Sequence, residues 1–277
     1  MASGMAGEWT DREGRKAGNK KVVLSRRMQM LADMVTAGSR VADVGCDHGL
    51  LPIYLVRTGK SPKCLAMDVR KGPLSGAEKH IAFCGLGEYI ETRLSDGLMA
   101  YHIGEAETLV CAGMGGRLME RILTEGGEKS RSFAELILQP QSEIPEFRRF
   151  LRNAGYLITG EEAVYEEKKF YFAMKAVYRG QEMSVDREIP GGQGMPAEWD
   201  GSAERGPLEL YDLYGEYLLR GRHPVLKQYL QKRLRAVEEL IGQLRRKDSV
   251  RSGNRQRELI LEKEQLESAL ELFEKGR

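Results

Sequence analysis

Short apolar runs alternate with amphipathic stretches over residues 21–179 of this chain. The runs are short and end in glycine or polar turns, which predicts buried strands. The stretches between them have the 3/4 spacing of apolar positions that is typical of helices. The expected strands lie at 40–45, 63–69, 89–97, 107–116 and 133–140, and the expected helices at 50–59, 72–86, 116–126 and 142–156.

A period of two runs along residues 155–179 on both sides of Glu167-Lys168, which predicts a long β-hairpin. Strands that alternate with helices predict a parallel sheet with helices on both faces. A terminal antiparallel hairpin on such a sheet is the arrangement of class I S-adenosylmethionine (SAM) methyltransferases. The predicted fold class is therefore α/β, a Rossmann-like and mostly parallel sheet that ends in an antiparallel hairpin.

Residues 207–277 consist almost entirely of helix formers and are expected to form a separate domain. Two series of apolar residues predict two helices with coiled-coil seams. A turn expected at Ser249, Gly253 and Asn254 makes them an antiparallel coiled-coil hairpin. The series lie at 230, 234, 237, 241 and 244 and at 259, 266, 270 and 273.

Two segments are expected to lie outside the folded parts. Residues 1–20 are rich in glycine and charge, which predicts a disordered tail. Residues 180–206 contain almost no aliphatic run and are interpreted as a linker or flexible insert. Residues 21–179 then form the methyltransferase-like domain.

The composition narrows the class of protein. An apolar content of 41% in 277 residues suffices for a packed core, and the net charge of +2 excludes a uniformly basic nucleic-acid binder. Any nucleic-acid surface must then be a local patch. Residues 223–257 carry ten Lys/Arg against three Asp/Glu, a net of +7. They are either a solvated helix face or a basic arm that grips phosphates.

Other features concern the protein's setting. No stretch approaches the ~20 apolar residues that a membrane span needs, and residues 1–21 lack the apolar core of a secretory signal. The four cysteines are scattered without a CxxC pair, which argues against structural zinc and disulfides. The histidines show no metal-ligand spacing. We therefore expect a cytoplasmic protein with no metal and no membrane partner.

The first strand is followed by the sequence Asp43-Val-Gly45-Cys-Asp47-His-Gly49. A dinucleotide-binding fold would place G-x-G-x-x-G here to hold a pyrophosphate. Asp47 instead occupies the position of the second glycine. Its carboxylate would repel a pyrophosphate but attract the sulfonium or amino group of SAM, which favours SAM. The alternative is an ordinary strand–turn–helix corner.

Two further acids follow the next strands. Asp68 lies 23 residues after Gly45, where an acid commonly accepts hydrogen bonds from ribose hydroxyls. Asp96 stands where such folds commonly hold the adenine amino group. The alternative interpretation of Asp68 is an N-cap for the following helix, and that of Asp96 is a turn residue before Gly97. Acids at three successive strand ends share the carboxyl edge of the sheet, where ligands bind.

The fourth and fifth strands end in residues that suit an acceptor pocket. Glycines in the segment 111–117 leave room for a flat substrate beside the methyl group. Gln139-Pro140-Gln141 either contacts a base edge or shapes a turn. His48 is either a general base or a packing residue. Cys46 and Cys111 fall near the pocket and are interpreted as buried, inert thiols.

Five segments in this order resemble the bacterial TrmK group: VADVGCDHGLLP, AMDVRKGPL, RLSDGL, AGMGG and LILQP. Members of that group are tRNA methyltransferases that methylate N1 of the adenine at tRNA position 22. The resemblance runs from about residue 22 to 277 and includes LYGEYLLRGRHPVLKQYL in the helical part. The combination of G-x-D-H-x-x-L-P with A-G-M-G-G is specific, whereas neither segment alone is.

The resemblance implies a SAM cofactor, a tRNA substrate and a reaction centre at Asp47, which is the candidate catalytic residue. The candidate cofactor-binding residues are Asp43, Gly45, Cys46, Asp47, His48, Gly49, Asp68, Val69, Asp96, Gly97, Gly113 and Met114. The candidate substrate-binding residues are Gly115, Gly116, Arg117, Gln139 and Pro140.

Two other functions stay open from the sequence. One is a SAM-dependent methyltransferase of the same fold whose substrate is a small molecule or a protein instead of RNA. The other is an RNA-binding module with a vestigial SAM pocket. The acids at 43, 68 and 96 argue against the second.

Overall fold

The structure is a computed structural model that describes residues 22–180, 208–244 and 250–274. The expected tail at 1–20 lies outside these ranges, as does the expected linker apart from Gly180. The sheet part contains β1 (Val41–Val44), β2 (Cys64–Asp68), β3 (Ile90–Leu94), β4 (Thr108–Met114), β5 (Glu135–Pro140), β6 (Tyr156–Glu166) and β7 (Lys169–Tyr178). Its helices are α1 (Arg26–Met34), α2 (Leu50–Arg57), α3 (Lys71–Phe83), α4 (Gly116–Gly126), α5 (Glu128–Arg131) and α6 (Ile144–Asn153).

The strands form one seven-stranded sheet in the order β3-β2-β1-β4-β5-β7-β6. Strands β1 to β5 pair in parallel, and β7 joins β5 and β6 in antiparallel pairs. This confirms the predicted Rossmann-like sheet with a terminal hairpin. The strand order reverses between β1 and β4, and in open α/β sheets ligands bind outside the carboxyl ends at such a point.

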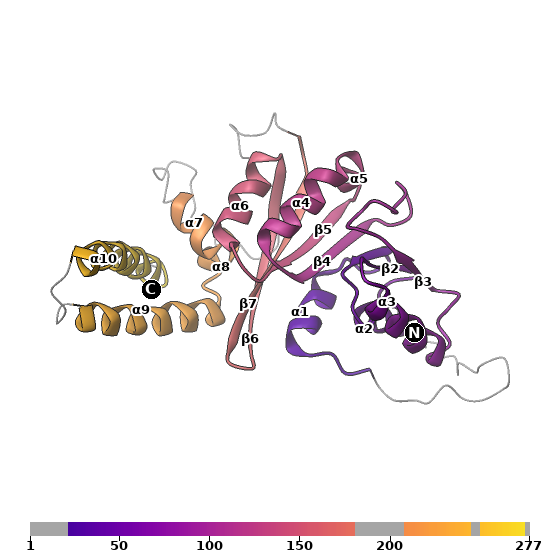
Figure 1. Cartoon of the computed structure of the whole chain (residues 1–277), viewed down its shortest axis with the longest axis horizontal. Helices are drawn as coiled ribbons and strands as arrows, with labels where there is room; N and C mark the ends of the chain where they lie inside the picture. Colours follow the sequence, from indigo (N-terminus) through magenta and orange to yellow (C-terminus); the bar gives the residue numbers. More distant parts are fainter. Residues whose placement is uncertain (1–21, 181–207, 245–249, 275–277) are drawn as a thin grey trace, which may run out of the picture.

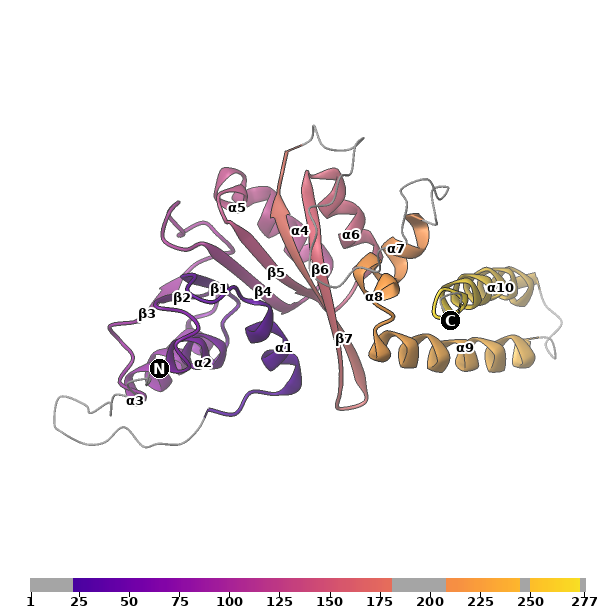
Figure 2. The ribbon, with the colours of Figure 1, turned by 180° about the vertical axis from the view of Figure 1, so that it is seen from behind.

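Helices cover both faces of the sheet (Figures 1 and 2). One core joins Val44 and Met67 of the strands to Met119 of α4 and Phe147 of α6. The second core, on the other face, joins strand residues to α1, α2 and α3. The short central strands are buried along their whole length, because each is covered on both sides.

The β6–β7 hairpin turns at Glu167 and Lys168, as predicted from the period-two pattern. Both residues have positive φ, 48° and 64°, as the central residues of a type I′ turn require. The tip of the hairpin reaches back to the first helix. Glu166 accepts hydrogen bonds from the backbone N–H groups of Arg26 (2.6 Å) and Arg27 (3.2 Å).

The C-terminal part contains α7 (Leu208–Tyr214), α8 (Glu216–Arg220), α9 (Pro224–Leu244) and α10 (Val250–Glu271). The described parts of α9 and α10 run in opposite directions side by side (Figures 1 and 2) and are joined by the ion pairs Arg233–Glu262 and Glu238–Lys263. The predicted apolar residues fill the contact, and the buried ones are Leu230, Val237, Ile241, Leu259, Leu266 and Phe273.

The predicted position of the turn between these helices is partly wrong. Gly253 and Asn254 lie inside α10, which begins at Val250, and Ser249 lies outside the described residues. Single glycine or asparagine residues lower helix propensity by about 1 kcal/mol or less, and packing of the rest of α10 against α9 overrides that preference. In the part of the chain that the structure describes, no helix is long and apolar enough to cross a membrane.

Candidate active site

The turn after β1 is built from three residues with left-handed backbone. Gly45, Asp47 and Gly49 have φ of 82°, 49° and 71°. The N–H groups of Gly45 and Cys46 both donate to Met67 O of β2, at 2.8 and 3.0 Å, and Gly49 begins α2. Glycine adopts this conformation without strain, and aspartate tolerates it better than most residues. The chain therefore turns sharply and exposes Asp47 at the carboxyl edge.

Two buried carboxyl groups lie at the ends of β1 and β2. Asp43 and Asp68 are 5% and 4% exposed. Burial, reinforced by the Asp68 charge, raises the pKa of Asp43 to about 7. Asp68 Oδ1 accepts a hydrogen bond from Arg70 N at 2.8 Å. The N-cap of α3 is Arg70 and receives no side-chain cap, so the alternative interpretation of Asp68 as a helix N-cap is wrong. The structure thus brings together the two acids that the sequence placed at neighbouring strand ends.

Cys46 is buried beside these acids, and Val69 is exposed at the rim. Burial raises the pKa of the Cys46 thiol, and the nearby Asp43 and Asp68 raise it further. The thiol of Cys111 is also buried, and burial again raises its pKa. Both thiols therefore stay protonated near neutral pH, which agrees with the interpretation as inert cysteines.

His48 packs against α3. A Cβ on Gly76 would lie 3.0 Å from His48 Nδ1, and the ring of His80 lies 5.8 Å from the His48 ring between centroids. His48 Nε2 is 3.7 Å from Asp47 Oδ1. The Asp47 side chain is 67% exposed. Of these neighbours, Asp47 is the one that presents an open carboxylate to a ligand.

The end of β3 is tied to both β2 and α4. Ser95 N donates to Asp68 O at 3.0 Å, and Arg121 of α4 donates to Asp96 Oδ1 at 3.0 Å. Gly97 has φ of 53° and packs under Ile122, where a Cβ would lie 3.0 Å from Cγ1. Asp96 therefore stands beside the Asp68 strand end, half-exposed and paired with Arg121.

The end of β4 carries a bulge at Gly113, whose φ is 79°. Gly115 and Gly116 follow and lie close to the turn after β5. A Cβ on Gly115 would lie 2.9 Å from Ser142 Oγ, and one on Gly116 would lie 2.7 Å from Ser142 O. The glycines thus let two backbone segments approach each other.

Gln139 and Pro140 of β5 are buried under this loop, and Arg117 points away from it. Gln139 is fully buried, and its Nε2 donates to Pro140 O at 3.0 Å. The Arg117 side chain is 85% exposed, with Nε 3.7 Å from Glu143 Oε1. The Gln139 side chain is therefore closed to a ligand and is held by Pro140 and by Arg27 Nη1, whereas the Arg117 side chain is accessible to a large partner.

A protein-family profile described as a methyltransferase domain matches residues 24–174, more than half of the chain. The chain is also 33% identical over 163 residues to the tRNA (adenine(22)-N(1))-methyltransferase of Bacillus subtilis strain 168. That alignment covers 59% of this chain and 68% of the other protein. The chain belongs to the TrmK-type methyltransferase family.

Solved structures agree with this TrmK-type assignment. The crystal structure of the Bacillus subtilis m1A22 tRNA methyltransferase TrmK matches with a TM-score of 0.71 and 27% identity, covering 90% of this chain and 99% of that one. A Streptococcus pneumoniae structure in complex with S-adenosyl-L-methionine matches with a TM-score of 0.70 and 28% identity. It covers 91% of this chain and 100% of the other.

The strand ends of this TrmK-type chain fit SAM in charge and in shape. Asp43, Asp47 and Asp68 place three acidic side chains at this edge, which suits a ligand with a sulfonium, an amino group and ribose hydroxyls. At the meeting point of β1 and β4, Gly45 makes room for the end of the Met114 side chain and Gly113 makes room for Arg27. No group of three or more His, Cys, Asp or Glu side chains suited to a metal ion occurs among the described residues.

Sequence reasoning missed one residue at the TrmK-type site, Arg27 of α1. Its Nη1 donates to Gln139 Oε1 at 3.1 Å and would lie 3.1 Å from a Cβ on Gly113. The signal for α1 was present: Ser25 caps the helix by accepting from Met28 N, and apolar residues follow at 28, 31, 32 and 35. No pattern in the sequence indicated that Arg27 would contact Gly113.

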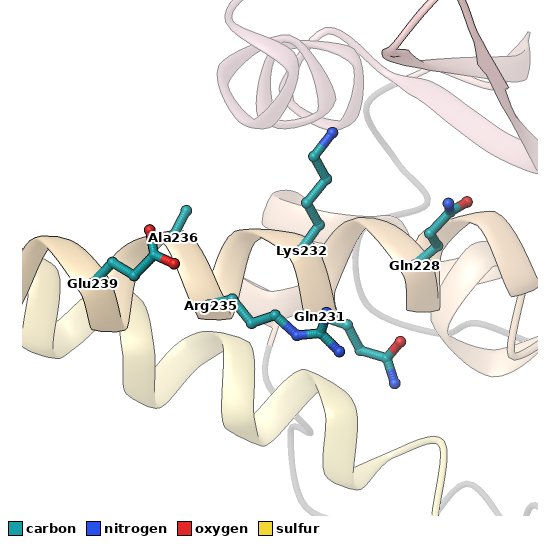
Figure 3. A pocket seen from close by; sticks show the side chains of 6 residues that line it. All are labelled: Gln228, Gln231, Lys232, Arg235, Ala236 and Glu239. Carbon is teal, nitrogen blue, oxygen red and sulfur yellow. The ribbon is translucent and has the colours of Figure 1, made fainter.

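Two cavities of the TrmK-type chain lie away from the strand ends. One, of about 420 Å³, separates the start of α6 from α7, α9 and α10 and is lined by Ser142, Phe172, Tyr214 and Tyr229 among others. The second, of about 390 Å³, is an open hollow on α9 (Figure 3). The chemistry of the strand ends locates the active site, and neither cavity includes those residues.

Proposed function

We propose that this chain transfers a methyl group from SAM to N1 of the adenine at position 22 of tRNA. The observation that carries the proposal is the meeting of two strand ends in a TrmK-type chain. The acidic turn after β1 and the glycine-rich turn after β4 adjoin at the reversal of strand order. The relative with 33% identity is named for this reaction.

We assign the cofactor to the edge formed by β1, β2 and β3. Asp68 would accept hydrogen bonds from ribose hydroxyls, and Asp96 would contact the adenine amino group once it leaves Arg121. The backbone around Gly45 and Gly113 would lie along the methionine part. SAM supplies an electrophilic methyl group on a sulfonium. The chain's own contribution is to bind and orient it.

Asp47 is the proposed catalytic residue. Adenine N1 has a lone pair in the plane of the base, so it attacks a methyl carbon without prior deprotonation. The ring becomes cationic as the bond forms, and a carboxylate next to it stabilises that charge or accepts a hydrogen bond from the exocyclic amine. Asp47 is exposed at the right edge, and its turn is fixed by Gly45 and Gly49. Alignment of the two substrates supplies much of the remaining acceleration.

The segment Gly113-Met114-Gly115-Gly116 is the proposed floor for the target base. N1 lies on the Watson–Crick edge, so the base must leave any pairing or stacking, which costs a few kcal/mol. Its three glycines add no side chain that would obstruct a flat base, while Arg27 and Ser142 pack against them. Arg117, exposed at the rim, would contact the RNA outside the pocket.

The helical pair is proposed to hold the body of the tRNA. Helix α9 is fixed to the sheet part, because Tyr229 packs edge-on against Phe170 and Phe172 at 5.3 and 5.4 Å between centroids. Arg235 and Gln231 point to one side of α9 and Lys232 points to the other (Figure 3). The Lys232 Nζ lies 5.4 Å from the centroid of the Tyr165 ring and 5.7 Å from that of the Phe170 ring in the hairpin. Both cations are exposed, and cations on a rigid helix give sequence-independent affinity for phosphates.

This assignment divides the chain into a methyltransferase domain at 21–179, a linker at 180–206 and a helical domain at 207–277. Strands β1 to β7 in the first part and helices α7 to α10 in the second support the division. We place the activity in the cytoplasm, where tRNA is modified. The four free cysteines suit its reducing conditions.

The test mixes the full chain with methyl-labelled SAM and unmodified tRNA transcripts. One transcript carries adenine at position 22, and the matched control carries guanine there. We expect label on the first RNA alone, with a reverse-transcription stop at that base. Label on both would discard the position. No label on either, with SAM binding intact, would point to a small molecule or protein as acceptor.

A further inference from the structure

Backbone hydrogen bonds fix the position of Arg27 on the sheet. It lies in the first turn of α1, and both its N–H and that of Arg26 donate to the Glu166 carboxylate at the tip of the β6–β7 hairpin. Ser25 completes the cap of the helix. The position of the Arg27 Cα is therefore set by the sheet and not by a free helix end.

Three contacts fix the guanidinium group itself. Nη1 donates to Gln139 Oε1 at 3.1 Å, and Gln139 is in turn fully buried. The guanidinium carbon lies 5.6 Å from the centroid of the Tyr171 ring. Nη1 would lie 3.1 Å from a Cβ on Gly113, so the absence of a side chain there makes room for it. The arginine thus lies against the floor of the proposed acceptor pocket.

In the described residues, no carboxylate forms an ion pair with this guanidinium, although the Glu166 carboxylate, which accepts from the Arg27 backbone N–H, lies near enough to interact with its charge. No Asp or Glu oxygen in the ranges 22–180, 208–244 and 250–274 lies within 4.0 Å of it. By contrast, Arg117 and Arg121 of α4 have such partners in Glu143 and Asp96. Gln139 uses one of the five N–H donors of Arg27. A half-buried cation with fixed orientation and spare donors is suited to an anion from outside the chain.

We infer that Arg27 binds an oxyanion of the reacting complex, directly beside the bulge at Gly113. This inference rests on the proposed function, in which both substrates carry such a group. One source is a phosphate of the target nucleotide, and the other is the carboxylate of the methionine part of SAM. Both match the planar pair of donors of a guanidinium. Arg27 then orients one substrate against the other.

The test compares Arg27→Gln and Arg27→Lys with the matched control Arg26→Gln. Arg26 is the preceding residue of α1, loses the same charge and has the same backbone bond to Glu166. For each full-length variant, the SAM Kd is measured by calorimetry, tRNA binding by filter retention at several salt concentrations, and folding by thermal unfolding.

We expect Arg27→Gln to raise the Kd of one substrate by about tenfold to a hundredfold, as the loss of hydrogen bonds to a charged group does. Arg27→Lys should lose less affinity than Arg27→Gln, and both Kd values of Arg26→Gln should stay within about twofold of the wild type. A change confined to tRNA, with the slope of log Kd against log salt reduced by roughly 0.7–0.9, identifies the phosphate. A change confined to SAM identifies the carboxylate.

Three outcomes would overturn the inference. The first is that Arg27→Gln changes neither the SAM affinity nor the tRNA affinity, and the second is that Arg26→Gln has the same effect as Arg27→Gln. The third is that Arg27→Gln lowers the unfolding temperature while the folded fraction binds both substrates as the wild type does. Failure of the proposed function is distinguishable from these, because it appears in the wild type. A wild-type chain that binds SAM and tRNA without methylating position 22 would refute that function, and the binding comparison of the variants would still decide the role of Arg27.

Discussion

Gly45 of the first strand end lies in contact with Met114 of the fourth, since a Cβ on Gly45 would stand 2.9 Å from Met114 Cε. The two residues are 69 positions apart in the chain and belong to the two strands at which the strand order reverses. Gly45 also has a φ of 82°. A side chain at position 45 is therefore disfavoured both by its contact with Met114 and by the left-handed backbone.

Gly45→Ala should reduce SAM affinity by more than its effect on folding predicts. The left-handed φ costs alanine about 1–2 kcal/mol, and the added methyl group would lie 2.9 Å from Met114 Cε, so the end of the Met114 side chain must also shift. Gly59→Ala is the matched control, because Gly59 has a φ of 70° and no atom within 4 Å of the added Cβ. Calorimetry and denaturant unfolding should show equal stability losses but weaker SAM binding for the Gly45 variant alone. Equal SAM affinity of the two variants would contradict the assigned cofactor position.

Asp47→Asn should lose turnover while it keeps its fold. Asparagine tolerates the left-handed φ of 49° as well as aspartate does, so the turn is preserved. Loss of one charge-stabilising group at a reaction centre lowers kcat by roughly 10²–10³-fold. Single-turnover methylation of the adenine-22 transcript measures this, and calorimetry checks that SAM still binds. Unchanged single-turnover rates would remove Asp47 from the reaction centre.

The elements of the sheet were predictable because their signals are local. The strands at 40–45 and 63–69 end in Gly45 and Asp68, and α2 ends before Gly59, whose left-handed φ closes it. The hairpin was equally clear, because period two continues on both sides of Glu167-Lys168. Since parallel strands end at one edge, the acids at 43 and 68 could be expected to meet, and they do.

What could not be predicted depends on tertiary packing. Arg27 reaches Gly113 and Gln139 only because the β6–β7 hairpin fixes the start of α1, and no local pattern encodes that contact. Gln139 was expected either to contact a base edge or to shape a turn, and its side chain is fully buried in β5. The turn at Gly253 was misplaced because packing of α10 on α9 outweighs the weak helix propensity of one glycine.

Asp43 should make the stability of the ligand-free protein fall as pH rises from about 4 to about 7. Its ordinary pKa is 3.8, whereas burial raises the folded-state pKa to about 7. The folded state therefore keeps a proton in this window that the unfolded state has released, and stability falls by a few kcal/mol as pH rises. Asp43→Asn should flatten this part of the profile. Unfolding temperatures of both proteins at pH 4.5 and 7.5 test it, with Asp96→Asn as the exposed control, which should follow the wild type.

The buried ion pair between Arg148 and Glu161 should be the strongest single link between the sheet and the helical part. The two side chains are 3% and 1% exposed and 2.8 Å apart. Arg148 Nη1 also donates to the carbonyls of Asp212 and Leu213 in α7, and Glu161 accepts from Tyr217 N of α8. Burial raises the pKa of Glu161 despite the guanidinium, so removal of either charge leaves the other buried without compensation.

We expect Glu161→Gln to destabilise the folded protein by about 3–5 kcal/mol, as the breaking of one buried pair does. Glu258→Gln, which breaks the exposed pair with Arg255, is the control and should cost less than about 1 kcal/mol. Denaturant unfolding measures both. Because Glu161 joins the sheet to α8, tRNA binding should weaken in the folded fraction of Glu161→Gln, whereas SAM affinity should hold. A Glu161 variant as stable as the Glu258 control would show that apolar packing of α9 on the hairpin, and not this pair, fixes the helical part to the sheet.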